Sequence, residues 1–444
     1  CIEVPPPQLQ RKTILVDVKA SCISTGTELT GLEASGKSLL AKAKENPEKV
    51  KAALSRMKNE GVLSVLRRSK AKAENEMLSG YSAAGVVKSV GDEVTGFTEG
   101  MSVAIAGAGF ANHAEQVVVP VKLAVRMPDE VTFEEASTCA LGGIALQGIR
   151  RAEIAIGDYV VVFGCGAIGL LTVQMLKASG ARVIGIDIDS NRLYLAKELG
   201  AEYVFNPSEE DIVKKVLHST DGHGADEVIL TLATSSSEPV QQAFQIAKRK
   251  GRVVLVGVTG MELDRNEMYR KELDFVISTS YGPGRYDDRY EIDGIDYPYS
   301  YVRWTEQRNM EAYLQLIADQ SISLDNIISN SYPIDSAEEA YDSLTIEPKP
   351  LLVLLSYSSI DKEQSVESTK PITSSWSIPD SGELNVSLIG TGAFVRGMHI
   401  PNLLKLGNKY CISSLCDIDA ISARKTARLL KNDNIEIETD YRNV

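Results

Sequence analysis

A glycine-rich turn in the middle of the chain constrains the fold more than any other feature. The sequence VVVFGCGAIGLL places Gly164, Gly166 and Gly169 between an apolar run at 159–163 and a second apolar segment at 170–178. A G-x-G-x-x-G pattern is informative when it follows a strand and opens a helix. The first glycine permits a tight turn, the second a close backbone approach to a pyrophosphate, and the third close helix–strand packing. We therefore predict a dinucleotide-binding turn at the start of a helix, whose N-terminus favours phosphate.

An acidic residue stands at the spacing that such a turn requires. Asp187 ends the next predicted strand, at 183–188. Its carboxylate would accept hydrogen bonds from the adenosine ribose hydroxyls and would repel a 2′-phosphate, so the pattern favours NAD (NADH) over NADP. Arg192 either lies along the adenine or is a solvated helix residue. The other residues that we assign to this cofactor site are Ala167, Ile168 and Gly257.

The pattern around this turn predicts a doubly wound sheet. Strands are predicted at 159–163, 183–188, 227–233 and 252–256, and helices at 170–178 and 192–199. Apolar strands that alternate with helices are typical of a parallel sheet with helices on both faces. The alternating pattern at 12–20 and the glycine-punctuated β-type runs at 85–120 predict a smaller, mostly β domain before it.

Two further segments have a different character. The Lys- and Ala-rich stretch at about 35–78 has apolar residues at helical spacing, so we predict amphipathic helices that are either a solvated surface or a lid over an anionic substrate. Residues 358–383 are polar and Ser-rich, which predicts a linker. After it, a predicted strand at 384–389 leads into GTGAFVRG, with Gly390, Gly392 and Gly397. Asp417 ends the next predicted strand, so a second, truncated dinucleotide-binding unit is expected.

Composition excludes several classes of function. The net charge of −13 argues against nucleic acid and, more weakly, against an anionic membrane surface. No apolar run approaches the ~20 residues of a membrane span. None of the six cysteines lies in a C-x-x-C pair, so a disulfide framework or structural zinc site has no support in the spacing. Reduced thiols in the cytoplasm are the expectation.

These segments resemble two known families. Residues 12–357 resemble the medium-chain dehydrogenase/reductases through VGDEVTGFTEGMSV, HAEQVVVP, the Gly164 turn, DIDSNRLYLAKELGA and KGRVVLVGV. Residues from 384 resemble the start of the Gfo/Idh/MocA oxidoreductases. Together they are similar to bi-domain oxidoreductases of bacterial polysaccharide biosynthesis, for which the segment 280–310 and the Lys-rich insertion are the most telling marks. EPKP at 347–350 is similar to a Gfo/Idh motif but precedes the second turn, so we assign it no catalytic role; the lysine and histidine of that family would lie beyond Val444.

The resemblance implies an α/β architecture in five parts. A GroES-like, mostly β catalytic domain would occupy 1–134, and the NAD-binding Rossmann domain 135–275. The chain would return to the catalytic domain at 276–357, and pass through the linker at 358–383. The front part of a second Rossmann domain would occupy 384–444. The resemblance also implies a homodimer or homotetramer.

The zinc ligands of alcohol dehydrogenases are missing from the corresponding segments. SCISTGTE places Ser24 near the first ligand position, and GYSAAG places Tyr81 and Ser82 where histidine and glutamate would stand. Cys139, in STCALGG, does not fit the third position. We therefore expect no zinc, because zinc needs about four N, S or carboxylate ligands. An atypical zinc site built from Cys22, Cys139, His113 and Glu28 is the alternative.

Without zinc, another group must polarise the substrate carbonyl and move a proton. Tyr81 can donate to a developing alkoxide, and His113 titrates near neutral pH. Each also has a purely structural interpretation, as a packed tyrosine and a hydrogen-bonded histidine, and Glu28 can simply brace its turn. Further catalytic candidates are Thr27, Glu28, Tyr281 and Lys271. For the substrate we assign Tyr281, Arg285 and Arg303; the two arginines either hold an anionic group or form ordinary ion pairs.

These observations favour an NAD-dependent oxidoreductase. The resemblance implies a sugar or sugar-nucleotide intermediate as the small-molecule substrate, with hydride transferred to or from a hydroxyl or carbonyl carbon. Two alternatives remain. One is a non-catalytic NAD-binding sensor or scaffold in a glycan biosynthesis complex, and the other is a zinc dehydrogenase with atypical ligands.

Overall fold

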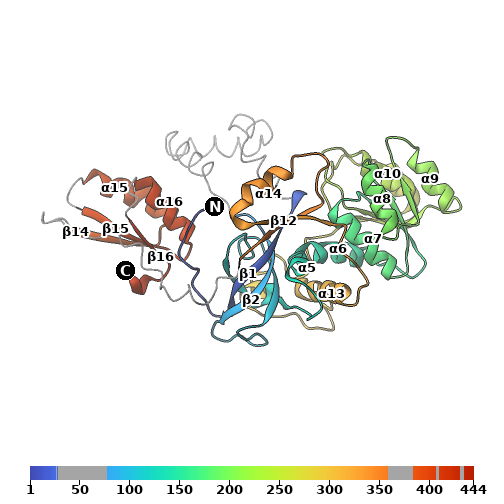
Figure 1. Cartoon of the computed structure of the whole chain (residues 1–444). Helices are drawn as coiled ribbons and strands as arrows, with labels where there is room; N and C mark the ends of the chain where they lie inside the picture. Colours follow the sequence, from blue (N-terminus) through green and yellow to red (C-terminus); the bar gives the residue numbers. More distant parts are fainter. Residues whose placement is uncertain (27, 29–77, 359–383, 407–409, 431–434) are drawn as a thin grey trace.

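The structure, a computed structural model, describes residues 1–26, 28, 78–358, 384–406, 410–430 and 435–444. The predicted helical insertion, apart from Leu78, and the linker from residue 359 lie outside the described residues, as does Thr27. We call residues 12–357 the first module and residues 384–444 the C-terminal unit. Figure 1 shows three sheets, with the sheet of the C-terminal unit set apart from the other two.

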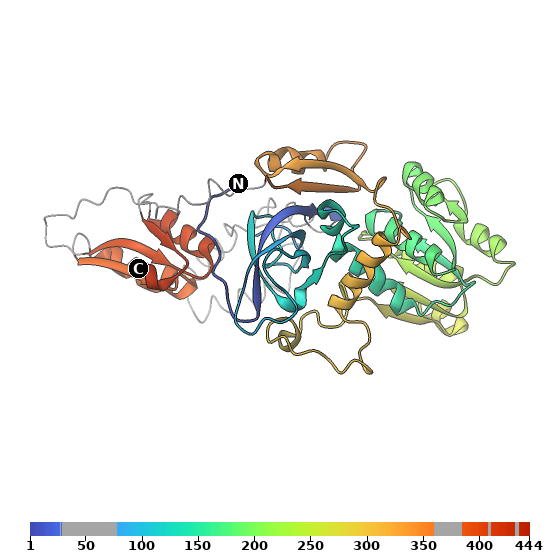
Figure 2. The ribbon, with the colours of Figure 1, turned by 60° about the horizontal axis from the view of Figure 1, so that its bottom comes forward.

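A long central strand organises the first sheet. β1 (Thr13–Ile23) is antiparallel to β2 along most of its length, to β4 along its first half and to β13 near its end. Its side chains are buried almost throughout because neighbours flank it on both sides. The pairing with β13 brings the end of the first module back onto its beginning (Figure 2). The other strands of this sheet are β2 (Ser82–Val90), β3 (Ser102–Ala106), β4 (Gln116–Pro120), β5 (Ala124–Arg126), β12 (Ile328–Pro333) and β13 (Leu352–Ser356).

The second sheet is parallel, with the order β11-β10-β9-β6-β7-β8. It is the doubly wound order, in which the direction of winding reverses between β6 and β9. A ligand in such a sheet binds beyond the carboxyl ends of the strands at this reversal, where the Gly164 turn lies. The strands are β6 (Tyr159–Phe163), β7 (Arg182–Ile186), β8 (Tyr203–Phe205), β9 (Ala225–Leu230), β10 (Ala247–Leu255) and β11 (Asp274–Ile277).

The sequence of β6 explains why this sheet is covered on both faces. Val160 and Val162 belong to a core shared with α6 (Cys139–Ala152) and α7 (Ala167–Ala178). Val161 and Phe163 belong to a second core with α9 (Ile212–Ser219) and α10 (Glu238–Ile246). Successive side chains of a strand point to opposite faces, so a continuous apolar run requires helices on both. The structure confirms the predicted α/β fold with a doubly wound sheet.

The remaining helices of the first module connect or cover these sheets. α13 packs on α6, where a Cβ on Gly142 would lie 2.2 Å from the Tyr313 ring. The helices are α5 (Phe133–Ala136), α8 (Ser190–Glu198), α11 (Arg265–Lys271), α12 (Asp288–Glu291), α13 (Glu306–Ala318) and α14 (Ala337–Ser343). Short 3-10 turns occupy Val121–Leu123 and Ile334–Ser336.

The C-terminal unit contains a second parallel sheet, in the order β14-β15-β16. Its strands are β14 (Leu384–Ile389), β15 (Tyr410–Cys416) and β16 (Glu436–Glu438). A π-helical turn at Val395–His399 leads into α15 (Ile400–Lys405), and α16 (Ala420–Leu430) follows β15. The chain ends in a 3-10 turn at Tyr441–Asn443. Among the helices described in either part, none is both long and apolar enough to cross a bilayer.

Candidate cofactor and active site

The three glycines of the first turn meet three different constraints. Gly164 has φ +101°, a conformation that residues with a Cβ rarely adopt, and its N–H donates to the Ile186 carbonyl over 2.7 Å. A Cβ on Gly169 would lie 1.9 Å from the Gly164 carbonyl oxygen, so only glycine lets α7 approach β6 this closely. Gly166 faces open space: a Cβ there would have the Arg192 guanidinium, 3.9 Å away, as its nearest neighbour. A pyrophosphate-binding turn requires this combination of tight packing and an open backbone.

This contrast predicts opposite effects of two alanine substitutions. Gly169→Ala should lower the free energy of unfolding by about 1–3 kcal/mol, because the backbone oxygen of Gly164 must move. Gly166→Ala should leave stability nearly unchanged and weaken NADH binding at least about tenfold, since the methyl group occupies the pyrophosphate position. Urea unfolding and calorimetric titration with NADH measure the two effects. Equal NADH affinity of Gly166→Ala and the wild type would contradict the assignment of the turn.

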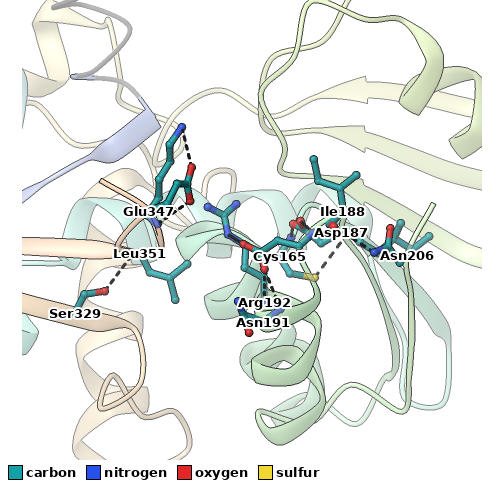
Figure 3. Close-up of polar contacts among 12 residues, drawn as sticks. Cys165, Asp187, Ile188, Asn191, Arg192, Asn206, Ser329, Glu347 and Leu351 are labelled. Atoms are coloured by element: carbon teal, nitrogen blue, oxygen red, sulfur yellow. Dashed lines mark hydrogen bonds and ion pairs between the residues drawn. The ribbon is translucent and has the colours of Figure 1, made fainter. Parts of the chain in front are cut away.

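Asp187 connects the glycine turn to the next strand. Its Oδ2 accepts a hydrogen bond from the Cys165 N–H over 2.6 Å, and its Oδ1 accepts one from the Asp189 N–H over 2.9 Å (Figure 3). Only 8% of the residue is exposed. Each carboxylate oxygen has a second lone pair, so these bonds leave acceptors for ribose hydroxyls. The sequence pattern gave no sign of the Cys165 contact, through which Asp187 fixes the position of the turn itself.

A cleft of about 450 Å³ lies beside this end of the cofactor site. The start of α8 lines one wall through Asp189 and Arg192, and the segment 346–351 lines the other (Figure 3). Arg192 Nε is 3.6 Å from Asp189 Oδ2, and its guanidinium extends toward Gly166. Arg192 is therefore placed over the phosphate-binding turn. The EPKP segment, to which we assigned no catalytic role, contributes to the opposite wall.

Other residues near the turn complete its packing. Ala167 and Ile168 form the first positions of α7, with Gly166 as its N-cap. Their N–H groups are among those that a helix leaves unpaired at its start. Gly257 follows β10, and a Cβ there would lie 2.0 Å from the Leu232 carbonyl oxygen. Gly257 thus lets two strand ends converge beside the turn.

The second glycine turn repeats the hydrogen bonds of the first. The Gly390 N–H donates to the Cys416 carbonyl over 2.7 Å, and the Thr391 N–H donates to Asp417 Oδ2 over 2.6 Å. Asp417 Oδ1 accepts from the Asp419 N–H over 3.0 Å. A Cβ on Gly392 would meet nothing within 4 Å. The two turns therefore share the same local construction.

One glycine of the second pattern does not have the role that the spacing suggested. A Cβ on Gly397 would also meet nothing within 4 Å, whereas its counterpart Gly169 is in close contact with the backbone. Gly397 lies in the π-helical turn, away from the strand end. The extra residues in G-x-G-x-x-x-x-G move it past the position where helix and strand meet.

His113 and Glu28 lie in one buried hydrogen-bonded network. His113 Nε2 is 3.2 Å from Glu28 Oε2, and the two side chains are 5% and 8% exposed. His113 Nδ1 is 2.7 Å from Ser21 Oγ, which is 2.8 Å from the Tyr357 hydroxyl. The Tyr341 hydroxyl donates to Glu28 Oε2 over 2.5 Å. Sequence reasoning did not identify Ser21, Tyr341 or Tyr357, because the contacts of the two tyrosines join segments more than 300 residues apart.

The charge on Glu28 follows from its donors. Burial opposes ionisation, but hydrogen bonds from His113 and Tyr341 and the backbone N–H of Ser24 outweigh it and lower the pKa of the carboxyl. His113 links the two ends of the network, because its Nε2 faces Glu28 and its Nδ1 faces Ser21. The arrangement braces residue 80: a Cβ on Gly80 would lie 2.9 Å from the His113 ring.

The network predicts a pH-dependent effect of Glu28→Gln. The amide has no charge and one acceptor oxygen, so the variant should lose about 1–3 kcal/mol of unfolding free energy at pH 7. Because the folded-state pKa of Glu28 is lowered, its contribution is complete above the unfolded pKa of about 4.3 and disappears as the pH falls through the folded value. Urea unfolding between pH 7 and pH 3.5 should show the two proteins converging. A constant difference between Glu28→Gln and the wild type would contradict the assignment.

The two tyrosines of the predicted site differ in burial. Tyr81 is half-buried against the core just before β2, and Tyr281 is 2% exposed. Burial raises the pKa of Tyr281, Arg285 opposes that shift, and Glu306, Glu291 and Tyr81 add to it. The Arg285 guanidinium lies 5.7 Å from the centroid of the Tyr281 ring, so the structure brings these two predicted site residues together. Thr27 lies outside the described residues.

Three basic candidates have other partners. Arg285 Nη1 is 2.7 Å from Glu291 Oε1, so its charge is balanced inside the protein. Arg303 stacks on Trp304 and Tyr299, with its guanidinium carbon 3.8 and 4.8 Å from the ring centroids. Lys271 is held by the backbone. Its Nζ donates to the three carbonyls of Phe244, Gln245 and Ala247, which fixes it at the end of α10.

Comparison with known proteins agrees with this geometry. Residues 167–292 match the family model of the zinc-binding dehydrogenases. The chain is 27% identical over 224 residues to D-arabitol-phosphate dehydrogenase of Enterococcus avium, which covers 49% of this chain and 56% of that protein. It is 33% identical over 184 residues to (R,R)-butanediol dehydrogenase of Bacillus subtilis (strain 168). That match covers 41% of this chain and 51% of that protein. The chain thus spans about half the length of these two curated relatives.

A solved structure extends the likeness to the fold. Galactitol-1-phosphate dehydrogenase from Escherichia coli superposes with a TM-score of 0.62 at 20% identity, covering 80% of this chain and 95% of that chain. The first module has the fold of the medium-chain dehydrogenases.

Ser82, which we set against one of the zinc ligands of the dehydrogenases, has partners in the backbone. Ser82 Oγ donates to the Ser137 carbonyl and accepts from the Ala140 N–H, which binds it to the backbone. The Cys22 and Cys139 thiols are both fully buried, and their Sγ atoms donate to the Ile23 and Ile105 carbonyls. Within the described residues, no three His, Cys, Asp or Glu side chains gather as metal ligands would. Cys22, Cys139, His113 and Glu28 accordingly form no such group.

Proposed function

We propose that the first module is an NAD-dependent oxidoreductase that transfers hydride between the nicotinamide and a hydroxyl or carbonyl carbon of a sugar or polyol-type substrate. The observation that carries this proposal is the Gly164 turn at the reversal point of the sheet, with Asp187 holding it and facing the ribose position. The matched relatives are named as dehydrogenases of a polyol phosphate and a diol, which supports this substrate class. More specifically, we propose a sugar or sugar-nucleotide intermediate as the substrate.

The proposal includes proton transfer without zinc. In the direction of reduction, hydride adds to the carbonyl carbon, the C=O electron pair moves to oxygen, and that oxygen takes a proton. Tyr81 is our candidate donor, because a phenol can donate to the developing alkoxide and Tyr81 interacts electrostatically with Tyr281. The His113–Glu28 network is assigned to hold the segment that carries Tyr81, since His113 packs directly on Gly80.

We extend the proposal to the C-terminal unit. Gly390, Gly392 and Asp417 repeat the local construction of the first turn, which supports a second dinucleotide-binding unit of the Gfo/Idh/MocA type. A role of the fused units in polysaccharide biosynthesis, a cytoplasmic location and a homo-oligomeric state complete the proposal. The five-part domain organisation, with limits at residues 134, 275, 357 and 383, belongs to it as well.

The cofactor assignment predicts a change of preference in Asp187→Asn. The amide keeps one acceptor for the Cys165 N–H but loses the charge that repels a 2′-phosphate. NADH affinity should fall about tenfold, and the ratio of NADPH to NADH affinity should rise, both measured by calorimetric titration. Asp417→Asn is the matched control, because it makes the same change in the second turn: it should leave the first site intact and remove a second binding event. Unchanged preference in Asp187→Asn would count against the assignment.

The proposed chemistry predicts the behaviour of Tyr81→Phe. Loss of the proton donor should lower kcat for reduction of a sugar carbonyl by about 100-fold or more, with little change in NADH affinity. Tyr203→Phe, far along the chain on β8, is the control. Protein purified without chelator should contain far less than one zinc per chain. Stoichiometric zinc would instead support the dehydrogenase with atypical ligands, and NADH binding without any hydride transfer would support the non-catalytic sensor.

A further inference from the structure

A glutamate without a partner lies beneath the tyrosine site. Glu306 is 0% exposed, and neither of its carboxyl oxygens has a hydrogen-bond partner among the residues that the structure describes. Burying a carboxylate without donors or a counter-ion is costly, and such a group normally remains protonated instead. Neither the cofactor site nor the proposed proton donor uses this residue. Its position therefore requires a separate explanation.

The loop above Glu306 is unusually wound. Ser280, Gly282, Gly284 and Tyr286 all have positive φ values, between 45° and 122°. Two of these residues are not glycine, and such backbone strain is concentrated at functional sites. A Cβ on Gly284 would lie 3.1 Å from Glu306 Oε1, and the Glu306 N–H donates to the Pro283 carbonyl over 2.8 Å. The loop is therefore closed directly over the carboxyl group.

The charges around Glu306 nearly cancel without it. Arg285 carries one positive charge, which its contact with Glu291 balances. Glu291 is 4% exposed, so solvent screens this pair little. An ionised Glu306 would leave the buried group with one net negative charge beside Tyr281. Glu306 interacts electrostatically with five charged or titratable side chains of the described residues: Arg285, Glu291, Tyr281, Tyr290 and Tyr297.

These surroundings favour the protonated acid. Burial raises the pKa of Glu306 to about 9; Glu291 adds to the shift and Arg285 opposes it. Glu306 is also the first residue of α13, where the helix dipole favours a negative charge. That effect is small compared with the burial of an unpartnered carboxylate. Glu28 is also largely buried, but it accepts three hydrogen bonds, and its pKa is lowered instead of raised.

We propose that Glu306 is a positioning residue of the hydride-transfer site, held as an uncharged carboxylic acid so that the group around Tyr281 stays neutral and negative charge can develop on the substrate oxygen. The inference rests on the proposed function of this site. Ionisation of Glu306 would place a negative charge beside Arg285 and Tyr281, to which we assign the substrate, and like charges in a buried site repel strongly. Glu306 thus links turnover to pH through the electrostatics of Arg285 and Tyr281.

The test compares Glu306→Gln with the wild type and with Glu306→Asp. In the wild type, kcat for reduction should fall about tenfold from pH 8 to pH 10, with a midpoint near the pKa of Glu306. Glu306→Gln is neutral at every pH, so the fall should vanish or move to higher pH, whereas Glu306→Asp should keep it. Glu338→Gln, an exposed first-turn glutamate of α14, is the control. The same midpoint in Glu306→Gln and the wild type overturns the proposal.

A second measurement needs no turnover. Because the folded protein retains a proton that the unfolded chain loses above about pH 4.3, the stability of the wild type should fall as the pH rises from 5 to 9. Glu306→Gln lacks this loss, so its thermal midpoint should gain on that of the wild type over the same range. A pH-independent difference overturns the neutral acid. If the midpoint of Glu306→Gln gains on that of the wild type but the protein transfers no hydride, the neutral acid is supported and the proposed function is wrong. If the protein transfers hydride but the difference between the midpoints does not change with pH, the proposed function is supported and the neutral acid is wrong.

Discussion

The close approach of α7 to β6 is the contact on which the cofactor site depends. Gly169 rests on the carbonyl oxygen of Gly164, and no side chain fits between them. This contact directs the start of α7 at the space beyond the sheet, where its unpaired N–H groups face a phosphate. Asp187 then holds the turn from the neighbouring strand through the Cys165 N–H. Helix, turn and acidic residue are therefore a single unit, in which the ribose-facing group also fixes the phosphate-facing backbone.

Two buried glutamates show how hydrogen-bond donors decide charge. Glu28 accepts from His113, Tyr341 and the Ser24 backbone, and these donors outweigh the cost of burial. In the described part of the chain Glu306 has no hydrogen-bond donor, and Arg285, the cation that acts on it, is already paired with Glu291. Burial alone would raise the pKa of both carboxyls, but only Glu28 has hydrogen-bond donors that lower its pKa again. Glu28, as a carboxylate, holds the segment before Tyr81. In our proposal Glu306, as an uncharged acid, adds no charge to the group around Tyr281.

The elements of the doubly wound sheet were predictable because their signals are local. The strand predicted at 159–163 has those bounds in the structure, since both faces of a parallel strand are buried and the apolar run is continuous. The helix predicted at 170–178 begins earlier, at Ala167, because glycines and small residues carry the turn directly into the helix. Gly397 shows the limit of pattern matching. Glycine spacing alone does not reveal whether a helix contacts a strand at that position, and here it does not.

The sequence by itself determined the fold class, the glycine turns and the acidic residues that follow them, because each depends on residues within one strand–turn–helix unit. Only the tertiary structure decided the state of the polar residues. Lys271 contacts three carbonyls at a helix end, Arg285 pairs with Glu291, and His113 meets Glu28. In the sequence, Glu306 is indistinguishable from a solvated glutamate at the start of a helix. Its burial follows from a loop that closes over it, and long-range contacts of this kind determine pKa values and side-chain partners without leaving a local pattern.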